Sequence, residues 1–338
     1  MKAVGLYEYL PITNENSFVD RDVEKPVAAG RDLLVKVEAV SVNPVDTKVR
    51  APKDKKEDVL KILGFDASGT IVEVGDDCTL FQPGDDVYYA GDITRQGSNS
   101  EFQLVDERIV AKKPTNLSFA EAAAMPLTSI TAYEALFDRM HIQKNAKGKT
   151  ILIIGGAGGV GSIAIQLAKI VNLTVIATAS RIETEAWCRT LGADHIINHH
   201  HSLLDQLKEK GIGEVDYILC LNDTDCHFPG MAEAIKPQGT ICTIVENEKN
   251  LDIQLLKSKS VAFVWEFMFT RPMYQTEDML KQHELLTEVR DLFEQGKLQH
   301  TLTKVLRPVD AQNVRKAHTE LEKGKMIGKL VIEGFHKE

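Results

Sequence analysis

The 338-residue sequence has no long uninterrupted apolar run. Its longest aromatic and apolar stretch, residues 261–269, is too short to span a bilayer and contains Glu266. The N-terminal residues MKAVGLYEYLP lack the apolar region of a secretory signal, because Glu8 interrupts them early. We therefore expect a cytoplasmic protein with no membrane partner.

An excess of positive charge is also missing, and so is a regular cysteine pattern. The formal net charge is −9, and nucleic acids and anionic membranes attract basic surfaces, so neither is an expected partner. The cysteine count is odd and the positions are scattered, which predicts reduced thiols rather than a disulfide framework. These residues are Cys78, Cys188, Cys220, Cys226 and Cys242.

What the sequence does contain is material for a sizeable core. Hydrophobic residues make up 43% of the chain and charged residues 26%, which is typical of a globular protein. At 338 residues, the chain is longer than a domain with a single hydrophobic core usually is, which favours two domains.

Residues 150–170, TILIIGGAGGVGSIAIQLAKI, have the pattern of strand, glycine turn and helix. Four apolar residues precede the turn, as in a parallel strand buried on both faces. Gly156, Gly158 and Gly161 give the G-x-G-x-x-G spacing, with Gly159 and Val160 at the helix start. In this motif the first glycine allows the tight turn, the second lets the backbone approach a pyrophosphate, and the third lets helix pack on strand. The pattern predicts a dinucleotide site; the alternative is a purely structural turn.

The end of the next strand indicates which dinucleotide binds. Sites for NAD place an acid about 20 residues after the glycines, whereas NADP sites have small and basic residues there. Here Ser180 and Arg181 occupy that region and the first acid is Glu183. A hydroxyl and a guanidinium suit a 2′-phosphate, which predicts NADPH as the cofactor. The alternative is that Arg181 is only a solvated charge opening a helix over 181–191.

The pattern changes along the chain. The first third is rich in short strands, near 33–39, 69–74 and 102–110, with Gly/Pro turns, which predicts a small barrel-like domain. The charged segment 51–58 is expected to be a mobile loop. A capping box at Ser118 predicts a helix ended by Pro126, followed by a second helix over 129–140.

From residue 150, strands alternate with helices, which predicts an α/β fold with a doubly wound parallel sheet. The six strands are expected near Ile151, Leu173, His195, Val215, Thr240 and Val261. A helix over 276–295 and short strands at 302–306 and 329–332 then return to the first domain. The expected organisation is 1–125, 126–270 and 271–338, with the nucleotide domain inserted into the other.

Together, four segments give the chain a family resemblance. They are the glycine turn, residues 127–136 (LTSITAYEAL), residues 42–46 (VNPVD) and the turn at 83–85 (PGD). The chain resembles the medium-chain dehydrogenase/reductase superfamily, in its quinone oxidoreductase branch, which includes proteins described as zinc-type alcohol dehydrogenase-like. The resemblance covers nearly the whole chain. It implies a GroES-like β-rich catalytic domain with an inserted Rossmann-fold domain.

The resemblance also raises the question of zinc. Metal-dependent members place His and Glu at the positions of Phe65 and Asp66, and Cys near Ser41. A catalytic zinc needs three protein ligands of N, S or O type, and neither Phe65 nor Ser41 meets that need. The cysteines that hold structural zinc are also missing, since none lies between Cys78 and Cys188. We therefore expect neither a catalytic nor a structural zinc.

The histidine-rich segment 199–201 is expected to be a solvated loop rather than a metal site, because three consecutive residues cannot all face one ion. His199 has a further possible role, since NADPH-using relatives have tyrosine after the residue matching Asn198. We hypothesise that His199 contacts the 2′-phosphate. Cys220 falls inside an apolar strand and is expected to pack in the core.

Without a metal, hydride transfer needs a carbon that is already electrophilic. Quinones and α,β-unsaturated carbonyl compounds spread the developing charge themselves, whereas a simple ketone needs a Lewis acid such as zinc. The sequence therefore predicts a small-molecule reductase of this type. Two alternatives remain: a non-catalytic NADPH-binding redox sensor or structural protein, and a zinc-dependent alcohol dehydrogenase, which Phe65 and Ser41 disfavour.

The resemblance assigns roles to several residues. Thr128 matches a threonine at the nicotinamide end of the cofactor, with helix capping as the alternative. Asn43 is expected to hydrogen-bond substrate oxygen or the nicotinamide amide, or to be only a turn residue before proline. Many relatives have tyrosine at the position of Lys48, so the proton donor could be Lys48, Tyr89 or water, and Lys48 could equally be a surface charge.

The remaining candidates lie near strand ends. Val245 is expected at the carboxyl edge of the fifth strand, where ligands bind. Phe65, Phe267 and Phe269 could form a flat apolar pocket for the substrate or could belong to the core. Residues 261–269 exceed what one buried strand needs, and relatives pair such edges, so we expect a homodimer.

Overall fold

The computed structural model describes residues 1–336, which form two compact units. The split unit comprises Met1–Leu127 and the chain from Phe269 onward, and the continuous unit comprises Thr128–Met268. The junctions differ from the expected boundaries by two residues at each side (127 against 125, 268 against 270). Leu127 stays with the split unit because its backbone N–H donates to Asp66 Oδ1 at 2.7 Å.

The continuous unit contains a six-stranded sheet in which every neighbouring pair is parallel. The order across the sheet is β11 (His195–Ile197), β10 (Thr174–Thr178), β9 (Thr150–Ile154), β12 (Val215–Cys220), β13 (Ile235–Thr243) and β14 (Ala262–Trp265). The order reverses between β9 and β12. This arrangement confirms the doubly wound sheet, and its ligand-binding edge is expected at that reversal.

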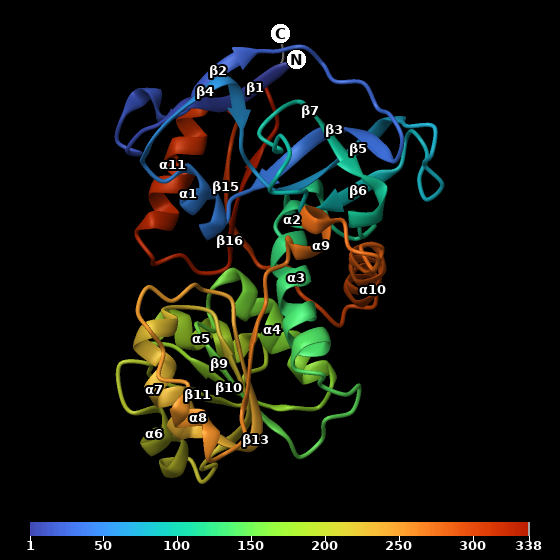
Figure 1. The fold of residues 1–338 in the computed structure, drawn as a ribbon. Helices are drawn as coiled ribbons and strands as arrows, with labels where there is room; N and C mark the ends of the chain where they lie inside the picture. Colours follow the sequence, from blue (N-terminus) through green and yellow to red (C-terminus); the bar gives the residue numbers. More distant parts are fainter. Residues whose placement is uncertain (337–338) are drawn as a thin grey trace. The chain divides into compact units, whose positions relative to one another are not determined.

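Helices lie on both faces of this sheet (Figure 1). One face forms a core with α6 (Leu203–Glu209), α7 (Thr224–Ala234) and α8 (Gln254–Lys257), in which Phe228 and Met231 of α7 are buried against Ile218 of β12. On the other side lie α4 (Gly159–Ile170) and α5 (Ile182–Thr190), whose Ile165 and Cys188 lie close to Gly156, as does Ala177 of β10.

The split unit contains two sheets. The larger has the order β15 (Leu302–Leu306), β16 (Lys329–Glu333), β3 (Asp32–Ser41), β5 (Asp66–Val74), β6 (Asp86–Tyr89) and β8 (Val110–Lys112), with β7 (Phe102–Asp106) also paired to β3. The smaller has the order β2 (Val19–Asp22), β1 (Lys2–Tyr9), β4 (Lys53–Ile62). Antiparallel pairing of β16 with β3 brings the end of the chain back to its first domain, as the sequence predicts.

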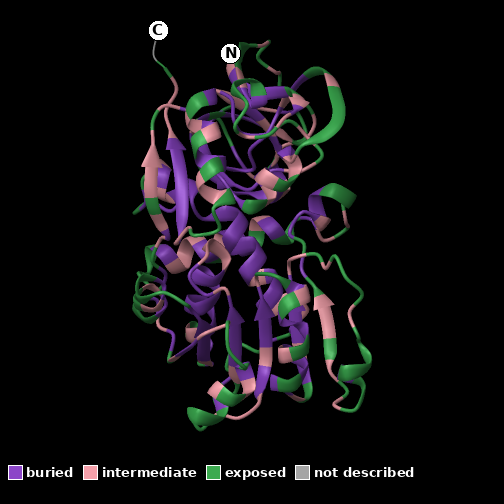
Figure 2. Ribbon diagram, turned by 90° about the vertical axis from the view of Figure 1, so that its left-hand side faces the viewer, coloured by how far each residue is buried: buried purple, intermediate pink, exposed green. Residues whose placement is uncertain are grey.

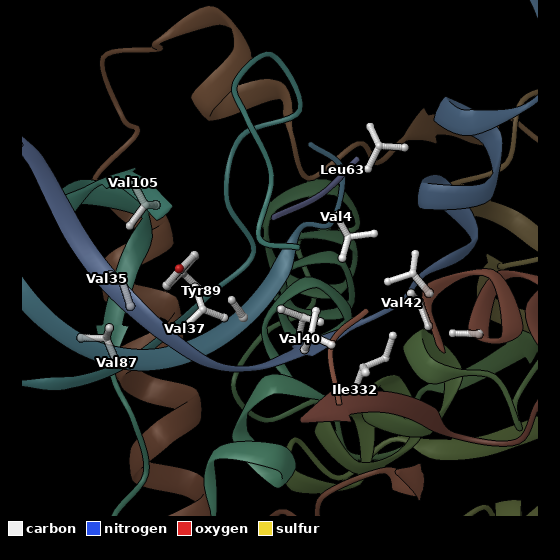
Figure 3. Packing of buried hydrophobic residues seen from close by; sticks show 14 of the residues in the cluster. Val4, Val35, Val37, Val40, Val42, Leu63, Val87, Tyr89, Val105 and Ile332 are labelled. Carbon is white, nitrogen blue, oxygen red and sulfur yellow. The ribbon is translucent and has the colours of Figure 1, made fainter. Parts of the chain in front are cut away.

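Valine-rich strands form the core of the split unit (Figure 3). Val35 and Val37 of β3, Val87 of β6 and Val105 of β7 surround Tyr89, and all are at most 2% exposed. Alternating residues of β3 point inward because successive side chains of a strand face opposite sides. Figure 2 shows this buried interior beneath exposed strand edges and helix faces.

The helices of the split unit are α1 (Pro44–Arg50), α2 (Phe119–Ala123), α9 (Thr270–Tyr274), α10 (Lys281–Glu294) and α11 (Ala311–Glu322), with 3₁₀ turns at Glu15–Ser17 and Glu107–Ile109. The capping box of α2 is present, because Ser118 N–H donates to the Glu121 carboxylate and the Glu121 N–H to Ser118 Oγ. Helix α10 begins later than expected, because Thr276 Oγ1 instead donates to Asp278 in a turn. No helix within residues 1–336 is both long and apolar enough to cross a membrane.

Pro126 opens a new helix after the end of α2. Helix α3 (Pro126–Tyr133) starts there and continues as a π-helical segment, Glu134–Arg139. The expected helix over 129–140 therefore begins three residues earlier, because proline is well placed in the first turn of a helix, where its missing N–H costs nothing.

The expected loop at 51–58 is wrong, because most of it belongs to β4. This strand pairs antiparallel with β1, and Lys56 faces Glu8 across the pair and forms a salt bridge with it. The Lys53 ammonium lies 4.0 Å from the ring centroid of Tyr9. Charged side chains are common on edge strands, where they discourage pairing with another chain.

Candidate functional site

The glycine turn lies at the carboxyl end of β9. Gly155 has a φ of 89°, so it makes the left-handed turn that L-residues disfavour. Its N–H donates to Thr178 Oγ1 at 3.0 Å, which ties the turn to the end of β10. Gly158 precedes α4 as its N-cap, and the first turn of the helix offers N–H groups without intrahelical partners. The arrangement can hold a pyrophosphate.

The three glycines of the motif differ in their surroundings. A Cβ on Gly156 would lie 2.8 Å from Ala177 Cβ, so a glycine is needed at this position because the space is crowded. The sequence analysis expected Gly156 to allow the tight turn. In the structure it is Gly155 that has the left-handed turn conformation. A Cβ on Gly161 would lie 2.4 Å from the Gly155 oxygen, in agreement with close helix–strand packing. A Cβ on Gly158 would meet only the Gly155 oxygen, at 3.6 Å, which leaves open space beside the backbone.

The neighbouring strand ends bring the predicted phosphate residues to the same edge. Thr178 of β10 pairs with Ile197 of β11, and Ala179 N–H donates to the Ile197 oxygen at 2.9 Å. Ser180 and Arg181 therefore leave the sheet beside Asn198 and His199. Both Ser180 and Arg181 are exposed, and the backbone of Arg181 begins α5 through hydrogen bonds with Thr184.

A cluster of histidine rings lies beside this edge. The His199 ring centroid is 4.3 Å from that of His200 and 6.1 Å from that of His227 on α7. Burial, together with repulsion from the other two rings, lowers the pKa of His199. Its Nδ1 is buried and has no hydrogen-bond partner within residues 1–336. His200 and His201 are exposed, and no group of His, Cys, Asp or Glu in the described chain has the arrangement of a metal site.

Further along the edge, Val245 follows β13. Its carbonyl oxygen accepts a hydrogen bond from Thr224 Oγ1 at 2.6 Å, and the Thr224 hydroxyl also lies 2.6 Å from that of Thr243. The sequence analysis did not identify Thr224, although it follows β12 at the point where this edge is expected. Cys220 is fully buried in β12, which confirms its core position.

Thr128 begins the continuous unit and lies inside α3 with 2% of its surface exposed, so it is not a helix cap. The π-helical segment that follows α3 buries Glu134, which lies against Glu266 at the end of β14. Burial and the neighbouring Glu134 raise the pKa of Glu266 to about 9, although Arg139 donates to it at 2.8 Å.

The split unit holds a buried polar cluster that joins three distant segments. Asn43 precedes α1, Asp66 begins β5 and Lys329 begins β16, and each is at most 3% exposed. Asn43 Nδ2 donates to Asp66 Oδ2 at 2.8 Å, and the Lys329 ammonium donates to the same oxygen at 2.9 Å. The ammonium also donates to Asn43 Oδ1 and, at 3.2 Å, to the Val42 oxygen.

Asp46 on α1 adds a second carboxyl group to this cluster. The Asn43 N–H donates to its Oδ2 at 2.7 Å, whereas its Oδ1 is buried without a hydrogen-bond partner within residues 1–336. Burial raises the pKa of Asp46 to about 7, even though backbone hydrogen bonds and the Lys329 charge oppose the increase. We call Asn43, Asp46, Asp66 and Lys329 the Lys329 cluster.

The predicted pocket residues Phe65 and Phe269 are buried and pack edge to face, with ring centroids 5.0 Å apart. Phe267 belongs to the continuous unit and is 40% exposed. Lys48 is exposed on α1, at the wall of a cavity of about 460 Å³ that Thr47 and Arg50 also line.

Tyr89 is the predicted proton donor that the structure places least favourably. Its side chain is fully buried in the valine core, and its hydroxyl has no hydrogen-bond partner within residues 1–336 (Figure 3). Burial raises the pKa of the phenol far above its ordinary value. A fully buried phenol with no hydrogen-bond partner in the described residues is poorly placed to donate a proton, so Lys48 and water remain as candidates.

Comparison with known proteins agrees with both units. The profile described as "Alcohol dehydrogenase GroES-like domain" matches residues 29–126, and the one described as "Zinc-binding dehydrogenase" matches residues 191–332. A zinc-type alcohol dehydrogenase-like protein from Staphylococcus aureus (strain Mu50) is 50% identical over 335 residues, covering 98% of this chain and 99% of that protein. The chain belongs to the medium-chain dehydrogenase/reductase superfamily.

Solved structures of this superfamily have the same fold. A candidate zinc-dependent alcohol dehydrogenase from Rhizobium etli is 50% identical, with a TM-score of 0.96 over 100% of this chain and 99% of that one. The quinone oxidoreductase of Coxiella burnetii is 27% identical, with a TM-score of 0.81 over 99% of each chain. As a member of the superfamily, this chain is an oxidoreductase.

The donor set of the split unit does not fit the zinc that these superfamily names imply. Ser41 Oγ donates to the Leu330 oxygen at 2.9 Å, and Phe65 has no ligand atom. Asp66 accepts hydrogen bonds from Leu127, Asn43 and Lys329, so both carboxylate oxygens are in use. The ammonium of Lys329 already supplies a positive charge there, and a second cation would be repelled.

Proposed function

We propose that this chain is an NADPH-dependent reductase that works without zinc and transfers a hydride to quinones or α,β-unsaturated carbonyl compounds. The Lys329 cluster is the observation that supports this proposal best. It holds an internal ion pair between Lys329 and Asp66, at the position where zinc-dependent relatives place metal ligands. Without a Lewis acid, the reaction favours substrates that delocalise the developing negative charge themselves.

The carboxyl edge of the continuous unit supports NADPH as the cofactor. The N-terminus of α4 and the open space beside Gly158 suit the pyrophosphate. Ser180 and Arg181 would contact the 2′-phosphate, and His199 from the neighbouring strand end would add a third contact. When bound, NADPH supplies the hydride, and the protein supplies orientation and electrostatics.

The remaining proposed roles concern the substrate. The Asn43 carboxamide would donate a hydrogen bond to substrate oxygen or to the nicotinamide amide, in the manner of an oxyanion-hole donor. Phe267 would supply exposed aromatic surface, whereas the buried Phe65 and Phe269 pack on each other, in line with the core alternative. Thr128 would contact the nicotinamide end and Val245 the cofactor edge. Lys48 or water would deliver the proton. The likeness to a quinone oxidoreductase at 27% identity supports the substrate class.

The test is the loss of nicotinamide absorbance when chelator-treated protein is mixed with NADPH and a panel of quinones and enones. We expect turnover with NADPH that exceeds that with NADH at least tenfold, and no gain from added zinc. Binding of NADPH without oxidation of any substrate would instead support a non-catalytic protein. Activity that appears only with stoichiometric zinc would reject the proposal.

Two variants test the phosphate site separately. Arg181→Ala is expected to raise the KM for NADPH about tenfold or more while leaving the KM for NADH unchanged, because only NADPH carries the 2′-phosphate. His199→Ala should have a smaller effect in the same direction. Exposed His201, two residues further on, provides the matched control as His201→Ala. Equal effects on both cofactors would remove the 2′-phosphate role.

We also propose that the chain forms a homodimer through β14. This strand lies at an edge of the sheet, and Trp265 is 45% exposed there. An unpaired edge that carries an exposed aromatic side chain is a surface on which a second copy can extend the sheet.

A further inference from the structure

The Asn43 carboxamide is held by two neighbours of opposite hydrogen-bonding character. A lysine ammonium can only donate, and an ionised carboxylate can only accept. Lys329 Nζ donates to Asn43 Oδ1, and Asp66 Oδ2 accepts from Asn43 Nδ2. The two partners therefore fix which end of the amide carries oxygen and which carries nitrogen.

This arrangement leaves one donor unused. Asn43 Nδ2 has two N–H groups and makes one hydrogen bond within residues 1–336, to Asp66. The backbone N–H of Asn43 is separately bound to Asp46. The second side-chain N–H is thus the only one the carboxamide can offer to a ligand.

Lys329 itself is fully engaged. Its three N–H groups match three acceptors, namely Asn43 Oδ1, Asp66 Oδ2 and the Val42 oxygen, and it is 3% exposed. An ammonium bound in this way has no donor left for a substrate. Its effect on a reaction must pass through the groups that it holds.

We propose that Lys329 is a positioning residue of this enzyme: with Asp66, it fixes the orientation of the Asn43 carboxamide so that one N–H remains directed away from the ion pair as a donor to the reacting molecule. The effect on catalysis rests on the proposed reductase function. The fixed orientation of the Asn43 carboxamide is independent of that function.

The geometry also explains why a neutral residue would not suffice at position 329. Without the ammonium, Asn43 Oδ1 would be a buried acceptor that has lost its donor. Leaving that acceptor unsatisfied is unfavourable, so the amide would shift toward another hydrogen-bond donor. A group displaced by about 1 Å from its productive position can cost on the order of 100-fold in rate.

The first test variant is Lys329→Met, which keeps an unbranched chain and removes the charge. Because this change leaves the buried Asp66 carboxylate without its counter-ion, it carries a risk of misfolding. The double variant Asp66→Asn/Lys329→Met removes both charges and guards against that outcome. It also replaces the carboxylate that specifies the orientation of Asn43.

The matched control is Lys259→Met in the continuous unit. Lys259 Nζ likewise bonds a carboxylate, Glu214, at 2.7 Å and backbone oxygens, including that of Ile235 at 2.8 Å. It lies outside the Lys329 cluster. We expect this variant to retain the wild-type kcat.

In Lys329→Met, or in the double variant if the single one does not fold, we expect kcat to fall about 10- to 100-fold. NADPH affinity, measured by fluorescence, should stay within about twofold because the glycine turn is unaffected. A crystal structure should show the Asn43 carboxamide turned from its present position. A folded variant with kcat within about twofold of wild type, or with Asn43 unmoved, would overturn the proposal.

Failure of the proposed function would be recognised separately. If the wild-type protein binds NADPH but reduces no quinone or enone, the reductase activity is rejected. The position of Asn43 in the variant structures still decides whether Lys329 fixes the carboxamide.

Discussion

His318 is a neutral side chain that cannot easily accept a proton. It lies on α11 with 1% of its surface exposed, and its ring packs edge to face on Phe18, 4.9 Å between centroids. Neither ring nitrogen has a hydrogen-bond partner within residues 1–336. Burial, and then the nearby Arg50 charge, lower its pKa to about 3.

This pKa makes the stability of the protein depend on pH. In the unfolded chain His318 has an ordinary pKa of about 6.5. Between about pH 6.5 and pH 3 the unfolded state therefore binds the extra proton, so the free energy of unfolding falls as the pH falls. One such proton corresponds to at most about 1.4 kcal/mol per pH unit.

We predict that His318→Phe reduces this slope by about one proton, because the ring is retained and the titrating group is removed. Urea unfolding at several pH values between 7.5 and 5 measures the slope. The exposed His201→Gln variant serves as the control and should keep the wild-type slope. An unchanged slope in His318→Phe would show that other groups cause the acid sensitivity.

The positions of candidate site residues could be predicted where their signal is local in sequence. Ser180 and Arg181 follow a recognisable strand at a known distance from the glycines, and the structure places them at the expected edge. Lys329 could not be predicted, because its partner Asp66 lies 263 residues away and no local pattern connects them. The crowding around Gly156 comes from α4, α5 and β10 together, which a motif does not contain.

At the scale of a single element, α4 offers a pair of glycines with opposite expected effects. A methyl group on Gly161 would collide with the Gly155 and Gly156 backbone, whereas one on Gly158 would meet a single atom at 3.6 Å. The φ of Gly158 is −72°, which alanine can adopt. Gly161 is therefore needed for close packing, whereas Gly158 keeps the space at the start of the helix open.

We predict that Gly161→Ala lowers the free energy of unfolding by about 1–3 kcal/mol, as expected for overpacking. Gly158→Ala should change it by less than about 1 kcal/mol and instead weaken NADPH binding about tenfold or more, because the methyl group enters the space left for the pyrophosphate. Chemical denaturation and cofactor fluorescence separate the two effects. Normal NADPH affinity in Gly158→Ala would place the pyrophosphate elsewhere.

The elements that sequence patterns identified best are those with strong periodicity. The six parallel strands and the α2 capping box were predicted because their apolar runs and end signals are local. Strand β4 was missed because its residues are mostly charged and exposed, and its stability depends on pairing with β1. Only its last residues alternate, with Leu60 and Ile62 buried, and the segment 53–58 has no apolar residue from which to recognise it.

At the scale of the whole molecule, the proposed dimer can be tested through β14. Trp265→Arg places a charge on the exposed edge and should raise the dimer dissociation constant at least tenfold, because the charge would be buried between the copies. Sedimentation velocity over a concentration series measures this. Ile182→Arg on α5 is the control, since Ile182 is 85% exposed on the same unit. A wild-type protein that sediments as a monomer would contradict the proposal.

The division into two units could be predicted, because the sequence pattern changes along the chain. The residues at which the units meet could not, because those boundaries depend on individual contacts. Leu127 and Phe269 belong to the split unit through Asp66 and Phe65, respectively. Both contacts join residues far apart in sequence, so the composition of the junctions alone does not reveal them.

The location of Lys329 near the end of the chain has a consequence for synthesis on the ribosome. Asn43 and Asp66 emerge early, but the cation that neutralises Asp66 is added 263 residues after it. The continuous unit, Thr128–Met268, is complete before then and can fold first. The split unit is thus the first to be started and the last to be finished, and a nascent chain that stops before β16 lacks the cation that pairs with Asp66.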